Sequence, residues 1–144
     1  MASIKITTGM KIYDIEDEHG NIRGQISFNP SDMNFFARAN QTQEMIQQAI
    51  AEFKNIDDEN VTEGIIIEKL EKIDTEIKEE INRLFDDSNT SNVIFGNQNC
   101  LNTLNGVTFI ERFLTAFAPI IKADFESEKK KSSNRIAKYT KQVK

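Results

Sequence analysis

The sequence predicts an α+β fold, mostly α: an N-terminal antiparallel β-hairpin, then a three-helix or four-helix bundle and a basic C-terminal tail. Three observations predict it: apolar residues first alternate with polar ones, then recur at helical spacing, and finally give way to a basic polar stretch. Because 144 residues suit one domain, we expect a single domain over 1–126. It divides into a hairpin in 1–29 and helices in 30–126, and 127–144 forms a flexible basic tail.

Residues 1–29 are predicted to form two or three short strands. The alternating apolar positions are Ile4, Ile6, Ile12, Ile15, Ile22, Ile26 and Phe28. Turn residues at Gly20-Asn21 separate two half-apolar segments, which is typical of a hairpin. An isolated hairpin is only marginally stable, so we expect it to pack against a helix.

The first helix is predicted to start at "NPSD", residues 29–32. Asn29 can cap a helix, Pro30 suits the first turn, and Asp32 favours the positive end of the helix dipole. An apolar face follows at Met33, Phe36, Ala37, Met45, Ile46, Ala49, Ile50 and Phe53. The polar stretch 40–44 interrupts this face, so the sequence permits one helix or two short ones. The polar residues 55–60 are expected to form a loop.

A second helix is indicated by a single narrow apolar stripe among glutamates and lysines. Its members are Ile66, Leu70, Ile73, Ile77, Ile81 and Leu84, spaced three or four residues apart. The carboxylates between them are expected to form a solvated face. The polar stretch 86–92 is predicted to end the helix and form a loop.

A third helix is predicted to start at Thr108, because Thr108 and Glu111 have the spacing of a capping box. Eight large apolar residues follow within 109–125, namely Phe109, Ile110, Phe113, Leu114, Phe117, Ile120, Ile121 and Phe125. We expect Phe113 and Phe117, with Ile73, Ile77 and Ile81, to be buried. This apolar face is nevertheless wider than the hairpin and the two other helices need in order to cover their own apolar residues. Part of it could therefore contact another chain.

Charge is distributed unevenly along the chain. From Ser127 to the end, seven basic residues face one acidic residue, Glu128, so this stretch carries +6. The whole chain carries −5 at pH 7, which leaves −11 on the preceding 126 residues. We expect the tail to dock only where an acidic surface lies close, because salt screens attraction beyond roughly 8 Å.

The residues that could carry chemistry argue against an enzyme. His19 is the only histidine and lies in a predicted turn, and Cys100 is the only cysteine, expected to be small and semi-buried. Neither phosphate-binding glycine motifs nor a calcium-loop pattern occurs. We therefore expect no catalytic residue, no metal site and no cofactor. No apolar run approaches the roughly 20 residues that span a bilayer, so a soluble, cytosolic protein without membrane contact is expected.

Three stretches of the chain carry a family resemblance. They are "FNPSDMNFFARA" (28–39), "LFDDSNTSNVIFGNQNCLNTLNGVTFIERFLTAFAPII" (84–121) and "NRIAKYTKQ" (134–142). Together they resemble the small tail assembly chaperone-like proteins of bacteriophages that infect low-GC Gram-positive bacteria. In that family a strand-rich start leads into helices, an "iFG" turn precedes the last helix, and a Lys/Arg-rich end follows.

The resemblance implies a non-enzymatic phage tail morphogenesis protein in the host bacterial cytoplasm. Such proteins bind the tape measure protein, keep it soluble and help recruit the tail tube protein, and a homo-oligomer is expected. The resemblance also implies that Phe95 fills the core, that Gly96 adopts a positive φ, and that residues 97–106 connect this turn to the last helix.

Candidate partner-binding residues lie on the last helix and in the tail. They are Phe109, Phe113, Phe117, Ile121, Phe125, Arg135, Ile136, Lys138 and Tyr139. Two other kinds of function stay open: another small phage protein that acts by protein binding, as a virion component or an inhibitor of a host defence protein, or a nucleic-acid-binding protein. The last would use the basic tail with Tyr139 as a stacking group, but the charge of −11 on the body repels phosphates.

Overall fold

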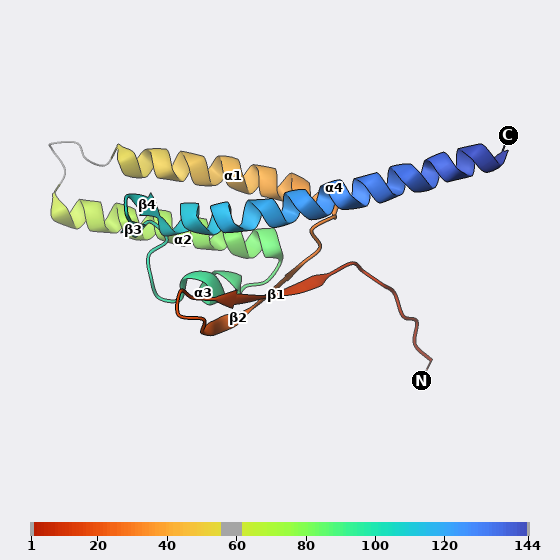
Figure 1. Ribbon diagram of the computed structural model, residues 1–144. Helices are drawn as coiled ribbons and strands as arrows, with labels where there is room; N and C mark the ends of the chain where they lie inside the picture. The colour runs from red at the N-terminus through yellow and green to blue at the C-terminus, as the bar shows by residue number, and fades with distance from the viewer. Residues whose placement is uncertain (1, 56–61, 144) are drawn as a thin grey trace.

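A computed structural model describes residues 2–55 and 62–143, with side chains up to Arg135. Figure 1 shows a β-hairpin followed by helices, which confirms the predicted fold class. In chain order the elements are β1 (Lys11–Glu16), β2 (Ile22–Phe28), α1 (Met33–Lys54), α2 (Glu63–Phe85), α3 (Thr90–Phe95), β3 (Thr103–Leu104), β4 (Val107–Thr108) and α4 (Phe109–Val143).

The predicted hairpin is formed by β1 and β2, which pair antiparallel with Lys11 opposite Phe28. Its turn is organised by Asp17, whose carboxylate accepts hydrogen bonds from the backbone N–H groups of His19 and Asn21 at 2.9 and 3.0 Å. Residues 2–10 form no strand, so the third strand that the isoleucines at positions 4 and 6 suggested is absent from the described chain.

Helix α1 is one continuous helix, and the polar stretch 40–44 lies inside it. Its N-cap is Asp32, whose carboxylate accepts a hydrogen bond from Asn34 N–H at 3.0 Å. The predicted cap at Asn29 is therefore wrong. Its side chain instead accepts from Ser31 N–H and donates to the carbonyl of Thr8. The loop predicted for 55–60 lies almost wholly outside the described residues.

Helix α2 buries the predicted stripe. Ile73, Ile77, Ile81 and Leu84 are buried, and the stripe is only partly buried towards its start. The helix lies antiparallel to α1 (Figure 1), so the two form a helical hairpin. It ends at Asp86, which adopts the left-handed conformation with φ 51°.

A short helix and a short hairpin were not predicted. Helix α3 forms within 90–95, where the sequence suggested a loop up to residue 92 and a turn at Phe95. Strands β3 and β4 form a small hairpin within the predicted connector, joined by Asn105 and Gly106 with φ 53° and 81°. Positive φ at both central residues is what a two-residue hairpin turn requires.

The core is built around Phe28 of the hairpin. Its ring contacts those of Tyr13, Phe35, Phe85 and Phe117, with centroids 4.9 to 5.5 Å apart. Phe117 is buried as predicted, whereas Phe113 is only half-buried and stacks against it. One aromatic cluster therefore joins the hairpin to α1, α2 and α4.

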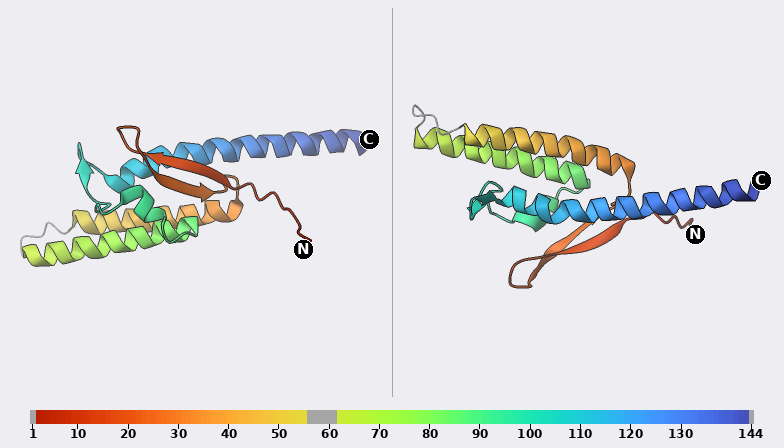
Figure 2. Two further views of the ribbon diagram at one scale, coloured as in Figure 1. Left: turned by 90° about the horizontal axis from the view of Figure 1, so that it is seen from below. Right: turned by 45° about the horizontal axis from the view of Figure 1, so that its top comes forward.

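Helix α4 is continuous to Val143 and passes through Pro119. Its second half stands away from the body (Figure 2), and the chain from Ser127 to Val143 is helical; that this basic tail is flexible stays a prediction. The reason for the helix is cooperativity, because a helix that is already nucleated propagates through Glu and Lys at little cost. Glu128 and Lys131 form an i,i+3 ion pair at 3.8 Å that favours this continuation.

Candidate functional site

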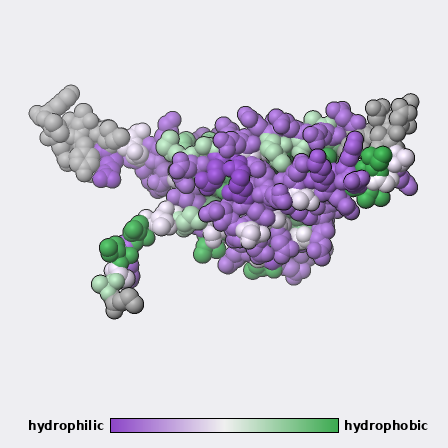
Figure 3. Space-filling view, turned by 180° about the vertical axis from the view of Figure 1, so that it is seen from behind, coloured by the Kyte–Doolittle hydropathy of each residue, from purple (hydrophilic) through white to green (hydrophobic). Residues whose placement is uncertain are grey.

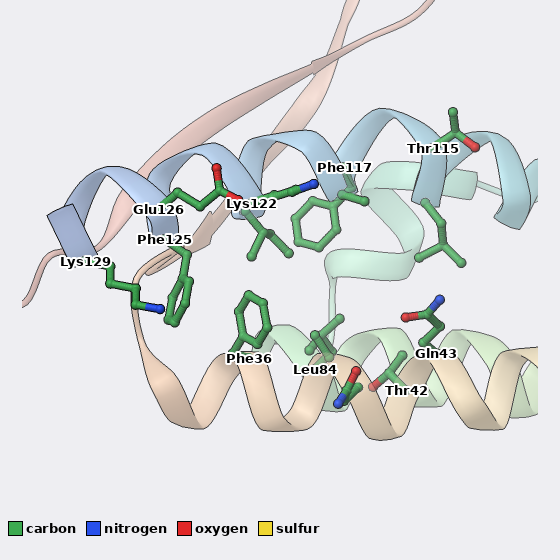
Figure 4. A pocket seen from close by; sticks show the side chains of 15 residues that line it. Phe36, Thr42, Gln43, Leu84, Thr115, Phe117, Lys122, Phe125, Glu126 and Lys129 are labelled. Atoms are coloured by element: carbon green, nitrogen blue, oxygen red, sulfur yellow. The ribbon is translucent and has the colours of Figure 1, made fainter.

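A groove of about 690 Å³ runs between α1 and α4. Figure 4 shows side chains from both helices facing each other across it. Its lining residues are Phe36, Ala39, Asn40, Thr42, Gln43, Leu84, Leu114, Thr115, Phe117, Ala118, Ile121, Lys122, Phe125, Glu126 and Lys129.

The inner surface of the groove is apolar. Leu84 of α2 forms part of this surface, together with Phe117 and Ile121 of α4. All three side chains are buried. At one end the rings of Phe36 and Phe125 stack with centroids 4.7 Å apart, which links α1 directly to α4. A ligand in this groove would therefore meet aromatic and aliphatic carbon.

The rims of the groove are polar. Asn40 and Gln43 of α1 line it, and so do Lys122 and Glu126 of α4. This arrangement explains the polar middle of α1, because part of that stretch borders the groove instead of entering the core. An apolar inner surface with polar edges matches the cross-section of an amphipathic helix.

A second hollow of about 520 Å³ continues the groove along the same two helices. The two hollows share Gln43, Leu114 and Thr115, and the second ends near Lys54. From Phe36 to Lys54 the two hollows together extend about 27 Å along α1, at a helical rise of roughly 1.5 Å per residue. This length corresponds to about five turns of a bound helix.

The predicted partner-binding residues divide into three groups. Phe117, Ile121 and Phe125 line the groove. Phe109 and Phe113 are half-buried and pack against the fully buried ring of Phe95, which places them in the core. In the tail, Arg135 is exposed on the projecting part of α4, and the side chains of Ile136, Lys138 and Tyr139 lie outside the described residues.

Sequence reasoning missed most of the α1 wall. Phe36 was recognised as apolar, but Ala39, Asn40 and Gln43 gave no signal of their own. A usable signal was the interruption of the α1 apolar face by polar residues, followed by its return one turn later. Such an interruption is what a helix shows where it borders a groove.

A polar network supports the wall of the groove. Thr42 is buried and donates its hydroxyl hydrogen to Glu80 at 3.1 Å, and Arg83 donates to the same carboxylate. The hydrogen bond from Arg83 is the largest cause that lowers the pKa of Glu80, and the hydrogen bond from Thr42 lowers it further. Burial acts in the opposite direction, but the pKa stays below its ordinary value. The network fixes α1 against α2 beneath the groove.

The connector 97–106 is tied to α2 rather than opening into a site. Asp74 accepts a hydrogen bond from Cys100 N–H at 2.8 Å and pairs with Lys78 at 3.0 Å, and Lys78 also donates to the carbonyl of Gln98 at 2.8 Å. The turn before it is as expected, since Phe95 is fully buried and Gly96 has φ 59°. This geometry supports a structural role for the connector.

We predict that Cys100 is unreactive in the folded protein. Burial, and next Asp74, raise the pKa of its thiol, so less of the reactive thiolate is present at any pH. Alkylation by iodoacetamide at pH 8, followed by mass spectrometry, should be at least about tenfold slower for native than for urea-unfolded protein. An exposed thiol introduced as Ser88→Cys serves as control, and equal rates at both cysteines would contradict the prediction.

Other features of the described chain give no further chemistry. Among residues 2–55 and 62–143, no three His, Cys, Asp or Glu side chains lie close enough together to hold a metal ion. His19 is exposed, and its ring nitrogen Nε2 lies 3.5 Å from a carboxylate oxygen of Glu18. None of the helices in this part of the chain is both long and apolar enough to cross a membrane.

Comparisons with protein-family models, curated proteins and solved structures found no match to this chain. What the structure itself offers towards a function is therefore the α1–α4 groove.

Proposed function

We propose that this protein is a non-enzymatic phage tail assembly chaperone that binds an amphipathic helix of the tape measure protein in the α1–α4 groove. The observation that carries the proposal is the groove itself, apolar inside and polar at both rims, with a length of about five helical turns. The choice of the tape measure protein as client rests on the family resemblance. The tail tube protein as a second partner and the host bacterial cytoplasm as location follow from the same resemblance.

The physical basis is the shielding of apolar stripes. A long helical protein exposes such stripes until it meets its final partners, and exposed apolar surface promotes aggregation. A helix in the groove would cover its stripe with Phe117, Ile121 and Leu114 while its polar edges face Gln43 and Lys122. The groove therefore has the properties needed to keep a helical client soluble.

The projecting half of α4 is basic, so it adds a preference for acidic residues in the client. Lys129 lies at the end of the groove, and Lys130 and Lys131 follow on the exposed helix. A client helix that leaves the groove in this direction would meet a basic surface, which favours acidic residues. Binding should then weaken as salt is raised, because exposed charges are screened.

We predict that Ala118→Trp blocks the groove. Ala118 is an exposed residue that lines the groove, so an indole there fills space that the client helix would occupy. When the tape measure protein of the same phage genome is co-expressed, its soluble fraction should fall, and its dissociation constant should rise at least about tenfold. Thermal unfolding should be unchanged.

The matched control is Ala116→Trp. Ala116 is also exposed on α4, two residues away and therefore on another face of the helix, and it does not line the groove. This variant should bind and solubilise the client as the unchanged protein does. Equal behaviour of the two variants would contradict the groove as binding site. A tape measure protein that stays soluble alone and never binds would contradict the chaperone function.

A further inference from the structure

The segment before β1 carries exposed apolar residues that contact little else in the described chain. Ile4 and Ile6 are 90% and 77% exposed. Figure 3 shows hydrophobic residues on a stretch of chain that stands away from the body. Because they alternate, both isoleucines lie on the same face when the segment is extended. Two β-branched residues at alternate positions are typical of a strand that packs against another surface.

This segment is held away from its own sheet. The side chain of Asn29 donates a hydrogen bond to the carbonyl of Thr8 at 3.1 Å, and Met10 N–H donates to the Thr8 hydroxyl at 3.3 Å. Between them Gly9 has φ 81°, and a Cβ there would lie 2.8 Å from the Asn29 amide nitrogen. These contacts fix the direction in which residues 3–8 leave β1, so they do not fold back onto it.

The outer edge of β1 offers a place for such a strand. In the described chain β1 pairs only with β2, whereas β2 also packs against α3. Alternate residues of an edge strand direct unpaired N–H and C=O groups outwards, and such an edge can accept a further strand. Tyr13 and Ile15 on this strand are only partly buried, so apolar surface lies beside the open edge.

We propose that residues 3–8 of one copy pair antiparallel with the outer edge of β1 in a second copy, and that the second copy does the same in return. The lengths match, because the segment and β1 have six residues each, about 20 Å of strand. Two identical strands that run through 3–16 in opposite directions form a two-fold symmetric pair. The result is a four-stranded sheet with β2 of each copy at its outside.

Charge favours the antiparallel direction. In that arrangement Lys5 of one copy lies towards the end of β1 in the other, where Asp14 and Glu16 are found. A parallel arrangement would bring Lys5 towards Lys11 instead. Opposite charges across neighbouring strands stabilise the pair and like charges destabilise it. A second copy therefore pairs with the open backbone edge of β1, covers the exposed isoleucines and brings opposite charges together.

The first test measures self-association of the full chain by sedimentation equilibrium. We expect a monomer–dimer equilibrium, and the double variant Ile4→Lys, Ile6→Lys should raise the dimer dissociation constant at least about tenfold. The matched control is Ile65→Lys, Ile67→Lys, which changes two exposed isoleucines with the same spacing on α2, 44% and 56% exposed. The control should dimerise as the unchanged protein does.

The second test locates the contact by hydrogen–deuterium exchange. Amides in 3–8 and 11–16 should exchange more slowly as protein concentration rises, and the double variant at positions 4 and 6 should lose this effect. A chain that stays monomeric, or a dimer that survives the double variant with unchanged affinity, would overturn the proposal. Protection that appears only when the tape measure protein is added would assign the edge to the client instead.

This inference is independent of the client-binding groove. Ala118 lines the groove and belongs neither to residues 3–8 nor to β1, so Ala118→Trp should leave the dimer dissociation constant unchanged. Loss of dimerisation with retained client binding would therefore implicate the edge alone. Loss of client binding in an intact dimer would implicate the groove alone.

Discussion

Replacing Phe117 by alanine should lower the free energy of unfolding by about 3–5 kcal/mol. Phe117 is 5% exposed, and its ring lies 5.0 Å from that of Phe28 and 5.3 Å from those of Phe85 and Phe113. Removing it opens a cavity where the hairpin, α2 and α4 meet. Urea unfolding followed by circular dichroism should show the loss as a lower transition midpoint with an unchanged slope.

The control for this prediction is Ile120→Ala. Ile120 is on the same helix but 37% exposed, so its replacement should cost about 1 kcal/mol or less. If Phe117→Ala cost as little and at the same time abolished self-association, Phe117 would be an interface residue. Because Phe117 supports the core as well as the groove, Ala118 is the better position for testing client binding.

The sequence predicted best what one element can specify by itself. The stripe on α2 was correct from Ile73 to Leu84, because three- and four-residue spacing reports directly which side of a helix is buried. The helix start at Thr108 was also correct, since the Thr108 hydroxyl accepts a hydrogen bond from Glu111 N–H at 3.2 Å and α4 begins at Phe109. Both signals are local, so no knowledge of the fold was needed to read them.

The start of α1 shows where local reasoning fails. Asn29 and Asp32 both have side chains that cap helices, and nothing in their spacing favours Asp32 over Asn29. The deciding contact is with Thr8, which holds the Asn29 amide 21 residues away along the chain. A hydrogen bond across that distance cannot be read from spacing.

The shortest elements were missed for two different reasons. Helix α3 has only six residues, too few to show a period, and depends on tertiary support such as the hydrogen bond from Ser91 N–H to Asn82 at 2.8 Å. The β3–β4 hairpin did have a signal, the Asn105-Gly106 pair, which favours a two-residue turn. Its strands of two residues each show no alternation, so the pair was read as part of a connector.

The groove could not be predicted because it is a property of two helices placed side by side. The α4 face was recognised as wider than a core requires, and part of that excess, Ile121 and Phe125, does line the groove. The division between Phe109, which packs on Phe95, and Phe125, which stacks on Phe36, depends on where α4 passes α1. That path is set by the aromatic cluster around Phe28, which joins residues distant in sequence.

Asp74 is one of the α2 side chains that hold the connector in place. The carboxylates of α2 were expected to form a solvated face, yet the side chain of Asp74 is only 17% exposed and that of Lys78 only 21%. One carboxylate oxygen accepts from Cys100 N–H and the other pairs with Lys78, which in turn holds the carbonyl of Gln98. Asp74 thus fixes the segment that leads into β3, β4 and α4.

Replacing Asp74 by alanine should therefore lower the free energy of unfolding by roughly 2–3 kcal/mol, because a backbone N–H and an ammonium group lose their partner in a poorly solvated place. Asp74→Asn keeps an oxygen that can accept from Cys100 N–H but removes the charge, so its loss should be smaller. The neighbouring Glu79 is exposed, and Glu79→Ala should change stability by about 0.5 kcal/mol or less. Urea unfolding measures all three, and iodoacetamide should reach Cys100 faster in Asp74→Ala than in the unchanged protein. Equal stability of Asp74→Ala and Glu79→Ala would show that the stability of the fold does not depend on the contacts of Asp74.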